Sequence, residues 1–223
     1  RAQVESTAEA ARALGVEALP LALDVTDPAS IASGVRDVAA KFGTLDVLVN
    51  NAGIAESAPF VRTDVELWQR HLAVNVTGPY LLTRQVLPGM LERRWGRVVN
   101  VASLAGLVGS PYVTAYTTSK HALVGFTRAL AAEVAGTGVT VNALCPGYVA
   151  TDMVWNGART IAARTGTSFE DAVAALARFN PGGRLIQPAE VAALAVGLLH
   201  DAATNGQALV LDGSAPPPRG GTP

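Results

Sequence analysis

The chain has 223 residues, of which 49% are hydrophobic and 16% charged, and its formal net charge at pH 7 is −1. This describes one α/β-sized domain with enough apolar side chains for a sizeable core, and the near-neutral charge excludes an electrostatic footprint for nucleic acid or an anionic membrane. The single cysteine, Cys145, excludes a disulfide within the chain, so we expect a reducing, cytoplasmic location. No apolar run approaches the length of a membrane span.

Helices and strands alternate in the first part of the chain. Asp27 and Pro28 mark a clear helix start, because an aspartate side chain accepts hydrogen bonds from the free N–H groups of a first turn and proline fits that turn. Residues 18–23, Ala-Leu-Pro-Leu-Ala-Leu, are apolar enough to predict a short strand. The expected elements are a helix over 3–14 that ends at Gly15, a strand over 18–23, a helix over 28–42 that ends at Gly43, and a strand over 45–49.

The same alternation continues toward the end of the chain. Residues 152–180 are less regular, contain a weak helical pattern, and are interpreted as a lid or a substrate-facing insertion. The expected elements are helices over about 64–74 and 76–93, a strand over 97–102, a helix over about 115–135, a strand over 139–144, helices over 168–179 and 188–199, and a strand over 207–211. Residues 1–214 are expected to form one domain, and the Pro- and Gly-rich residues 215–223 a disordered tail.

Strands that are apolar throughout and alternate with helices predict an α/β fold, a doubly wound and mostly parallel sheet of the Rossmann-like type. In such sheets ligands bind beyond the carboxyl ends of the strands. Polar or glycine-rich residues follow four of the predicted strands, which indicates a shared cleft, although turn chemistry could explain any one of them. These residues are Asp24, Asn51 to Gly53, Ser103, and Pro146 to Thr151.

The stretch from Ser103 to Lys120 carries the most specific chemistry. Tyr116 and Lys120 are four residues apart at the start of a predicted helix, so a phenol and an ammonium share one face. At roughly 5 Å and an effective dielectric constant of about 20, the ammonium would lower the pKa of the phenol by about two units, toward that of a general acid and base at neutral pH. Ser103 adds a hydroxyl that can hold a substrate oxygen. The alternative is an ordinary Tyr and Lys on a surface helix.

Together with further motifs, these residues resemble the short-chain dehydrogenase/reductase family over nearly the whole chain. The motifs are Asp24-Val25, Asn50-Asn51-Ala52-Gly53, Asn75, Ser103 with Tyr116-x-x-x-Lys120, and Pro146-Gly147 through Thr151. The resemblance implies a doubly wound oxidoreductase that uses NAD or NADP, and no metal, to interconvert a carbonyl and a secondary alcohol by hydride transfer. The implied catalytic residues are Asn75, Ser103, Tyr116 and Lys120. The implied cofactor-binding residues are Asp24, Val25, Asn51, Ala52, Gly53, Tyr116, Lys120, Pro146, Gly147, Val149 and Thr151.

The resemblance also implies a role for each catalytic residue. In reduction, Ser103 and Tyr116 hold the substrate carbonyl, and Tyr116 gives its proton to the developing alkoxide. Lys120 holds the nicotinamide ribose, and Asn75 orders a water that relays protons to Lys120. The segment 146–151 grips the nicotinamide carboxamide.

The sequence departs from the family pattern at its start. The family begins with a strand, a Gly-rich turn of the Thr-Gly-x-x-x-Gly-x-Gly kind, a helix and a second strand, and this sequence has none of them. Those glycines let the backbone approach the pyrophosphate at a helix N-terminus. We therefore expect an N-terminally incomplete domain that binds dinucleotide poorly. The choice between NAD and NADP stays open, because the end of the second strand decides it.

The substrate class follows from the resemblance alone. The layout is similar to family members that reduce 3-oxoacyl thioesters or oxidise 3-hydroxyacyl thioesters of acyl carrier protein or CoA, including polyketide ketoreductases. Sugars, polyols, steroids and small ketones are the alternative substrates, and a non-catalytic relative that has lost cofactor binding is the alternative to an enzyme. Arg159, Arg164 and Arg184 either meet a phosphopantetheine or CoA phosphate or are solvated surface charges.

Other reactive residue types indicate no site. The three histidines are dispersed, so no metal site is expected, and Cys145 is interpreted as a small buried residue rather than a nucleophile. Ser119 flanks the catalytic stretch but falls outside the family pattern. The long helices over 76–93 and 115–135 could pair with copies of themselves, and the resemblance implies a homo-oligomer, either a dimer or a tetramer.

Overall fold

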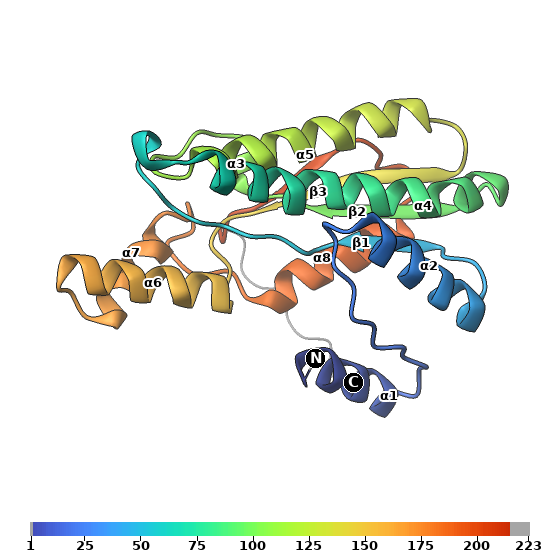
Figure 1. The fold of residues 1–223 in the computed structure, drawn as a ribbon, viewed down its shortest axis with the longest axis horizontal. Helices are drawn as coiled ribbons and strands as arrows, with labels where there is room; N and C mark the ends of the chain where they lie inside the picture. The colour runs from blue at the N-terminus through green and yellow to red at the C-terminus, as the bar shows by residue number, and fades with distance from the viewer. Residues whose placement is uncertain (1, 215–223) are drawn as a thin grey trace.

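The computed structural model describes residues 2–214, within which four strands form one parallel sheet (Figure 1). Across the sheet they lie in the order β1 (Val47–Asn50), β2 (Gly96–Val101), β3 (Val139–Pro146) and β4 (Ala208–Leu211). All neighbouring pairs are parallel, with Val99 of β2 opposite Val49 on one side and Asn142 on the other. The two central strands are almost entirely buried. The α/β fold class and the parallel sheet are therefore confirmed.

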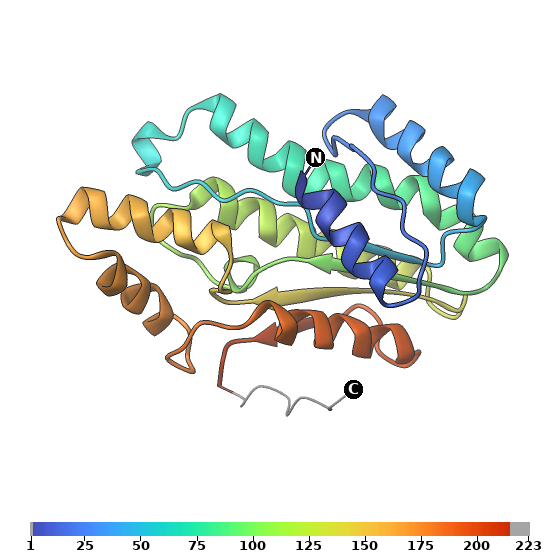
Figure 2. The same ribbon diagram turned by 90° about the horizontal axis from the view of Figure 1, so that it is seen from below.

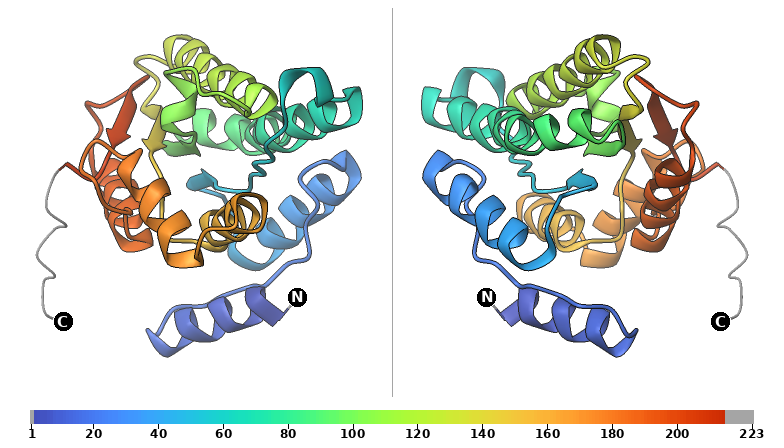
Figure 3. Two further views of the ribbon diagram at one scale, coloured as in Figure 1. Left: turned by 90° about the vertical axis from the view of Figure 1, so that its left-hand side faces the viewer. Right: turned by 90° about the vertical axis from the view of Figure 1, so that its right-hand side faces the viewer.

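Helices cover both faces of this sheet (Figures 2 and 3). α4 (Gly78–Glu92) and α5 (Thr114–Glu133) pack on one face, and α8 (Pro188–His200) packs on the other. α2 (Pro28–Phe42) packs against α4. The largest apolar cluster lies between the sheet and the helices α4 and α5, and it contains Val86, Met90, Val98, Leu130, Ala131, Val134, Val139 and Val141.

Local chemistry explains where α2 begins and ends. The Asp27 carboxylate accepts a hydrogen bond of 2.9 Å from the Ala29 N–H, and Pro28 occupies the first turn, as the sequence predicted. At the other end Gly43 has a φ of 81°, which glycine adopts without a steric penalty, and its N–H bonds to the Ala39 carbonyl. These residues fix both helix ends without help from the rest of the fold.

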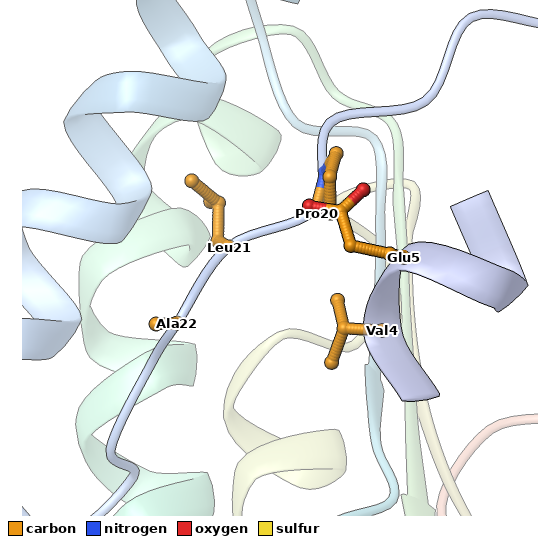
Figure 4. A pocket seen from close by; sticks show the side chains of 5 residues that line it. All are labelled: Val4, Glu5, Pro20, Leu21 and Ala22. Atoms are coloured by element: carbon orange, nitrogen blue, oxygen red, sulfur yellow. The ribbon is translucent and has the colours of Figure 1, made fainter. Parts of the chain in front are cut away.

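The strand predicted over 18–23 is wrong. This segment is extended but pairs with no strand in the described chain. A strand is held by hydrogen bonds to a neighbour, and Pro20 removes one donor from the middle of the run. The helix predicted over 3–14 is confirmed as α1 (Ala2–Ala13), which stands apart from the sheet (Figure 3). Between α1 and the extended segment lies a cavity of about 140 Å³ (Figure 4), lined by Val4, Glu5, Pro20, Leu21 and Ala22.

The helices predicted over 64–74 and 76–93 form one nearly continuous helical run. α3 (Val65–Leu72) passes into a π-helical turn, η2 (Ala73–Thr77), and then into α4. A π-turn carries one extra residue, locally changes the helix hydrogen bonding, and is frequent at functional sites. Asn75 lies in the middle of this turn.

Residues 152–180 are more helical than predicted. α7 (Phe169–Arg178) confirms the weak pattern, whereas α6 (Asp152–Thr165) was not predicted. The two helices pack against each other beside the end of the sheet (Figure 1). The remaining described elements are two short 3₁₀ turns, η1 (Phe60–Arg62) and η3 (Leu104–Gly106).

Two further sequence expectations concern the C-terminal tail and membrane-spanning segments. The tail predicted over 215–223 lies outside the described residues. Within residues 2–214, every helix is too short or too polar to cross a membrane.

Candidate active site

Ser103 follows β2 directly and caps η3. Its backbone is extended (φ −174°, ψ 161°), and its Oγ accepts a hydrogen bond of 3.1 Å from the Ala105 N–H. The residue is 9% exposed. Ser103 is therefore held at the carboxyl end of a central strand, where ligand sites of parallel sheets lie.

Tyr116 and Lys120 lie on the first two turns of α5. The Ser103 side chain lies close enough to the Tyr116 phenol to act on its pKa. The Lys120 ammonium lies 5.7 Å from the centre of the Tyr116 ring and donates to the Val101 carbonyl at 2.8 Å. Because Val101 ends β2, one strand end holds both the serine and the lysine. The structure brings the three predicted side chains into one cluster.

Burial changes the pKa of both ionisable groups in this cluster. It lowers the pKa of Lys120, which is 4% exposed, from 10.5 to about 8. It raises the pKa of Tyr116, and the neighbouring Ser103 side chain acts in the opposite direction. The expectation of a lowered pKa for Tyr116 is wrong for this structure, because desolvation of the phenol dominates. The phenol therefore stays protonated at neutral pH.

Asn75 is fully buried and ties three segments together. Its Oδ1 accepts from the Ile54 N–H at 2.9 Å, and its Nδ2 donates to the Ile54 carbonyl at 3.0 Å and to the Ser119 Oγ at 2.9 Å. Ser119 in turn donates to the Tyr116 carbonyl at 2.7 Å. Ser119, which sequence analysis set aside, thus links Asn75 to the turn that carries Tyr116. Its position next to Lys120 on an inward helix face is the signal that could have revealed it.

The predicted cofactor residues Asn51, Ala52 and Gly53 follow β1 and reach the cluster at Gly53. A β-carbon at Gly53 would lie 3.3 Å from Asn75 Oδ1 and 3.4 Å from Lys120 Nζ. The absence of a side chain therefore lets the end of β1 pack closely against the Asn75 amide and the buried ammonium. Asn51 and Ala52 are exposed at the same strand end.

Asp24 and Val25, predicted to contact adenine, lie next to the junction of η2 and α4. The Asp24 carboxylate accepts hydrogen bonds from the Thr26 N–H at 2.8 Å and the Thr26 hydroxyl at 2.7 Å, and these bonds lower its pKa. Val25 lies against Gly78, where a β-carbon would come within 2.8 Å of the Val25 carbonyl oxygen. The Asp24 carboxylate therefore stabilises its own turn through these hydrogen bonds.

The segment 146–151, predicted to hold the nicotinamide, passes beside the cluster. Tyr148 is near enough to Tyr116 for its phenol to contribute to the raised pKa of Tyr116. Val149 forms an isolated parallel bridge to the segment before α8, and Thr151 precedes α6 as its capping residue. The segment is therefore held in an extended course along the site.

His71 was not predicted as part of the site, yet it lies directly behind Tyr116. It is fully buried, its Nε2 accepts from the Glu56 N–H at 3.1 Å, and its Nδ1 lies 2.8 Å from the Leu67 carbonyl. These two partners assign the ring as neutral with the proton on Nδ1. Its edge meets the Tyr116 ring, with centres 6.4 Å apart.

Cys145 is fully buried, as expected, and burial raises the pKa of its thiol. It packs with Ala102, which directly follows β2, and with residues of β3 and α5. Among residues 2–214, no three His, Cys, Asp or Glu side chains gather where they could hold a metal ion.

The arginines considered for a phosphate have other partners. The Arg184 guanidinium donates to both carboxylate oxygens of Glu190 at 2.7 Å, so this arginine is ion-paired rather than a solvated surface charge, and its contact with a substrate phosphate stays a prediction. Arg159 donates to the Asn156 side chain at 2.8 Å and lies 5.7 Å from the centre of the Phe169 ring. Both charges serve the packing of α6, α7 and α8.

Comparison with known families decides what this fold is. A sequence profile described as short chain dehydrogenase matches residues 1–161, most of the chain. This chain belongs to the short chain dehydrogenase family. It is thereby an oxidoreductase by family, and the resemblance drawn from its motifs is confirmed.

The proteins that are similar to this chain are named for different activities. A D-β-hydroxybutyrate dehydrogenase of Cupriavidus necator is 42% identical over 181 residues, which are 81% of this chain and 70% of that protein. A protein of Xanthobacter autotrophicus named inactive 2-(S)-hydroxypropyl-CoM dehydrogenase 2 is 44% identical over 192 residues, 86% of this chain and 81% of that protein. A variant of actinorhodin polyketide ketoreductase, solved with NADPH, matches with a TM-score of 0.89 and 40% identity over 94% of this chain and 82% of that one.

The cluster fits the nicotinamide end of the dinucleotides that short chain dehydrogenases use. An ammonium has three N–H donors, and Lys120 gives one of them to Val101, which leaves two donors for the hydroxyls of a ribose. For the pyrophosphate, the sequence offers no Gly-rich turn of the family kind. The fit therefore concerns the nicotinamide and its ribose.

Proposed function

We propose that this protein transfers hydride between NAD or NADP and a carbonyl or secondary alcohol, and that its substrate is a 3-oxoacyl or 3-hydroxyacyl thioester. The observation that supports this most is the cluster itself: Ser103 lies close enough to the Tyr116 phenol to act on its pKa, and the Lys120 ammonium lies 5.7 Å from the centre of the same ring. A buried ammonium with a pKa of about 8 is typical of a functional site.

The proposed mechanism gives each side chain one task, and the dinucleotide supplies the hydride when it is bound. Tyr116, which stays protonated at neutral pH, donates its proton to the substrate oxygen as negative charge develops there. Ser103 donates a second hydrogen bond to that oxygen, and donors already in place stabilise the developing charge without reorganising. Lys120 holds the nicotinamide ribose.

In this proposal Asn75 positions a neighbouring turn, which is a narrower role than the proton relay that the resemblance implied. Its side-chain amide is occupied by Ile54 and Ser119, so it holds the turn that carries Tyr116. The expected relay of protons through Asn75 to Lys120 stays a prediction.

The proposed substrate class is supported by the names of similar proteins. One solved structure is of a polyketide ketoreductase, and one relative is named for β-hydroxybutyrate, which carries the same 3-hydroxyacyl unit as a free acid. Initial rates with acetoacetyl-CoA, free acetoacetate, a sugar and a cyclic ketone, each with NADH and NADPH, test this class. A kcat/KM for acetoacetyl-CoA below that of the other compounds contradicts the thioester proposal and leaves hydride transfer intact.

Several expectations about the whole protein stay predictions. They are the single domain over residues 1–214, the homo-oligomer and the weak dinucleotide binding of this chain by itself. Functional assays use the complete gene product.

Replacing Tyr116 by Phe tests the proposed function directly. We expect Tyr116→Phe to lower kcat by at least about 100-fold, the scale of lost general acid catalysis, while the Kd for dinucleotide stays the same. Tyr112→Phe is the matched control, since Tyr112 is 65% exposed on the loop just before α5. Activity of Tyr116→Phe within tenfold of the wild type contradicts the assignment.

A further inference from the structure

Asn180 lies just after α7 with its side chain buried against the segment that follows β3. It is 1% exposed. Its Oδ1 accepts from the Tyr148 N–H at 2.7 Å, and its Nδ2 donates to the Tyr148 carbonyl at 2.9 Å and to the Arg184 carbonyl at 2.7 Å. The amide thus pairs with both backbone groups of Tyr148, as a neighbouring strand would, and a third bond anchors it to its own turn.

Two further contacts make this arrangement specific. A β-carbon on Gly147 would overlap Asn180 Oδ1, so only glycine at 147 lets the amide approach the backbone. The ladder continues beyond the amide, where the Ile186 N–H donates to the Tyr148 carbonyl at 3.0 Å and the Ala150 N–H to the Ile186 carbonyl at 2.8 Å. The backbone from 147 to 150 is therefore fixed by contacts from residues 180–186.

The same contact joins the helical pair α6 and α7 to the site. Phe179, next to Asn180, places its ring 5.9 Å from the Tyr148 ring at an interplanar angle of 32°. Tyr148 in turn lies near Tyr116. Residues at the end of α7 therefore set both the backbone and a side chain beside the reacting groups.

We propose that Asn180 is a positioning residue, which holds the backbone of residues 147–149 in the conformation that binds the nicotinamide end of the dinucleotide. The inference rests on the proposed function, because that function assigns residues 146–151 to the nicotinamide. The adenosine end would bind elsewhere, so loss of the Asn180 amide affects recognition of the nicotinamide alone.

Two probes separate this role from a general structural one. NADPH or NADH carries the nicotinamide, whereas ADP-ribose and its 2′-phosphate lack it and keep the rest of the dinucleotide. In the complete gene product, we expect Asn180→Ala to raise the Kd for the dinucleotide about tenfold, and the Kd for the matching ADP-ribose to change less than about twofold. Asn180→Asp keeps the shape and the acceptor but turns a carboxylate toward two carbonyls, and it should show the same selective loss.

Asn205 provides a matched control. Its Oδ1 accepts from the Val141 N–H and its Nδ2 donates to the Ala131 carbonyl, both at 2.9 Å, at the opposite end of the strands. Asn205→Ala should leave the ratio of the two dissociation constants unchanged. Hydrogen exchange gives a readout that needs no cofactor, and the peptide covering 147–151 should exchange at least about tenfold faster in Asn180→Ala than in Asn205→Ala.

Each result decides between the possibilities. A folded Asn180 variant that binds dinucleotide like the wild type, or that loses dinucleotide and ADP-ribose equally, overturns the positioning role and leaves the proposed function standing. If Asn180→Ala does not fold, Asn180→Asp is judged by the same criterion. Wild-type protein that binds neither probe overturns the proposed function, and this inference with it.

Discussion

Replacing Lys120 by Met is expected to change how stability depends on pH. The pKa of Lys120 falls from 10.5 to about 8 because the ammonium is buried, so the folded protein binds this proton less tightly than the unfolded chain. A group of this kind destabilises the fold at any pH below its folded pKa, and the destabilisation is relieved as pH rises between the folded and unfolded values. Lys120→Met removes the titrating group and keeps the length of the side chain.

The magnitude follows from the two pKa values. At pH 7 the wild type carries about 3 kcal/mol of destabilisation from the charged form, and near pH 9.5 about 1 kcal/mol remains. The free energy of unfolding of the wild type should therefore rise by about 2 kcal/mol relative to that of Lys120→Met over this interval. The lost hydrogen bond to the Val101 carbonyl also affects the variant, but it adds the same amount at both pH values and cancels in the comparison.

Urea unfolding of both proteins at the two pH values, without cofactor, measures this difference. Lys41→Met is the control, because the Lys41 side chain is 39% exposed and its ammonium lies at the surface, 3.5 Å from the Glu17 carboxylate. Parallel pH dependences of the wild type and Lys120→Met would refute the reasoning, since they would mean that burial does not disfavour the Lys120 ammonium.

Two predictions concern the framework around the site. Asp27→Ala should lower the free energy of unfolding by about 1 kcal/mol in urea titrations, because the first turn of α2 loses its capping acceptor, whereas Asp27→Asn should retain most of the stability. Glu190→Gln should lower the thermal midpoint by roughly 4 °C at neutral pH. Arg184 lowers the pKa of Glu190, so the stability that this pair contributes is present above the ordinary carboxyl pKa and is lost as pH falls. An unchanged gap between wild type and Glu190→Gln in melts from pH 7 to about pH 4 would contradict that account.

The sequence predicted those features whose cause is local. Tyr116 and Lys120 share a helix face because of their four-residue spacing, and Asp27 with Pro28 starts α2 because a cap acts within its own turn. Ser103 was found because an apolar run ends just before it. Each of these signals lies within a few residues of the feature it predicts.

Prediction failed where the cause lies elsewhere in the chain. Residues 18–23 have the composition of a strand but no neighbour in the described sheet, and composition does not supply one. α6 has a glycine in its interior, Gly157, and is stabilised by packing on α7, which its own pattern does not show. Asn180 gives no local signal at all, because its partner Tyr148 is 32 residues away in the sequence.

The single thiol of the chain can be used to measure local opening of this site. Cys145 is inaccessible in the folded protein and lies under the residues around Ser103 and Lys120. A thiol-modifying reagent can therefore react only with molecules in which this region has transiently opened. The rate of labelling therefore measures how often this region opens locally. A small molecule that binds the closed site should slow that rate, and no probe has to be introduced.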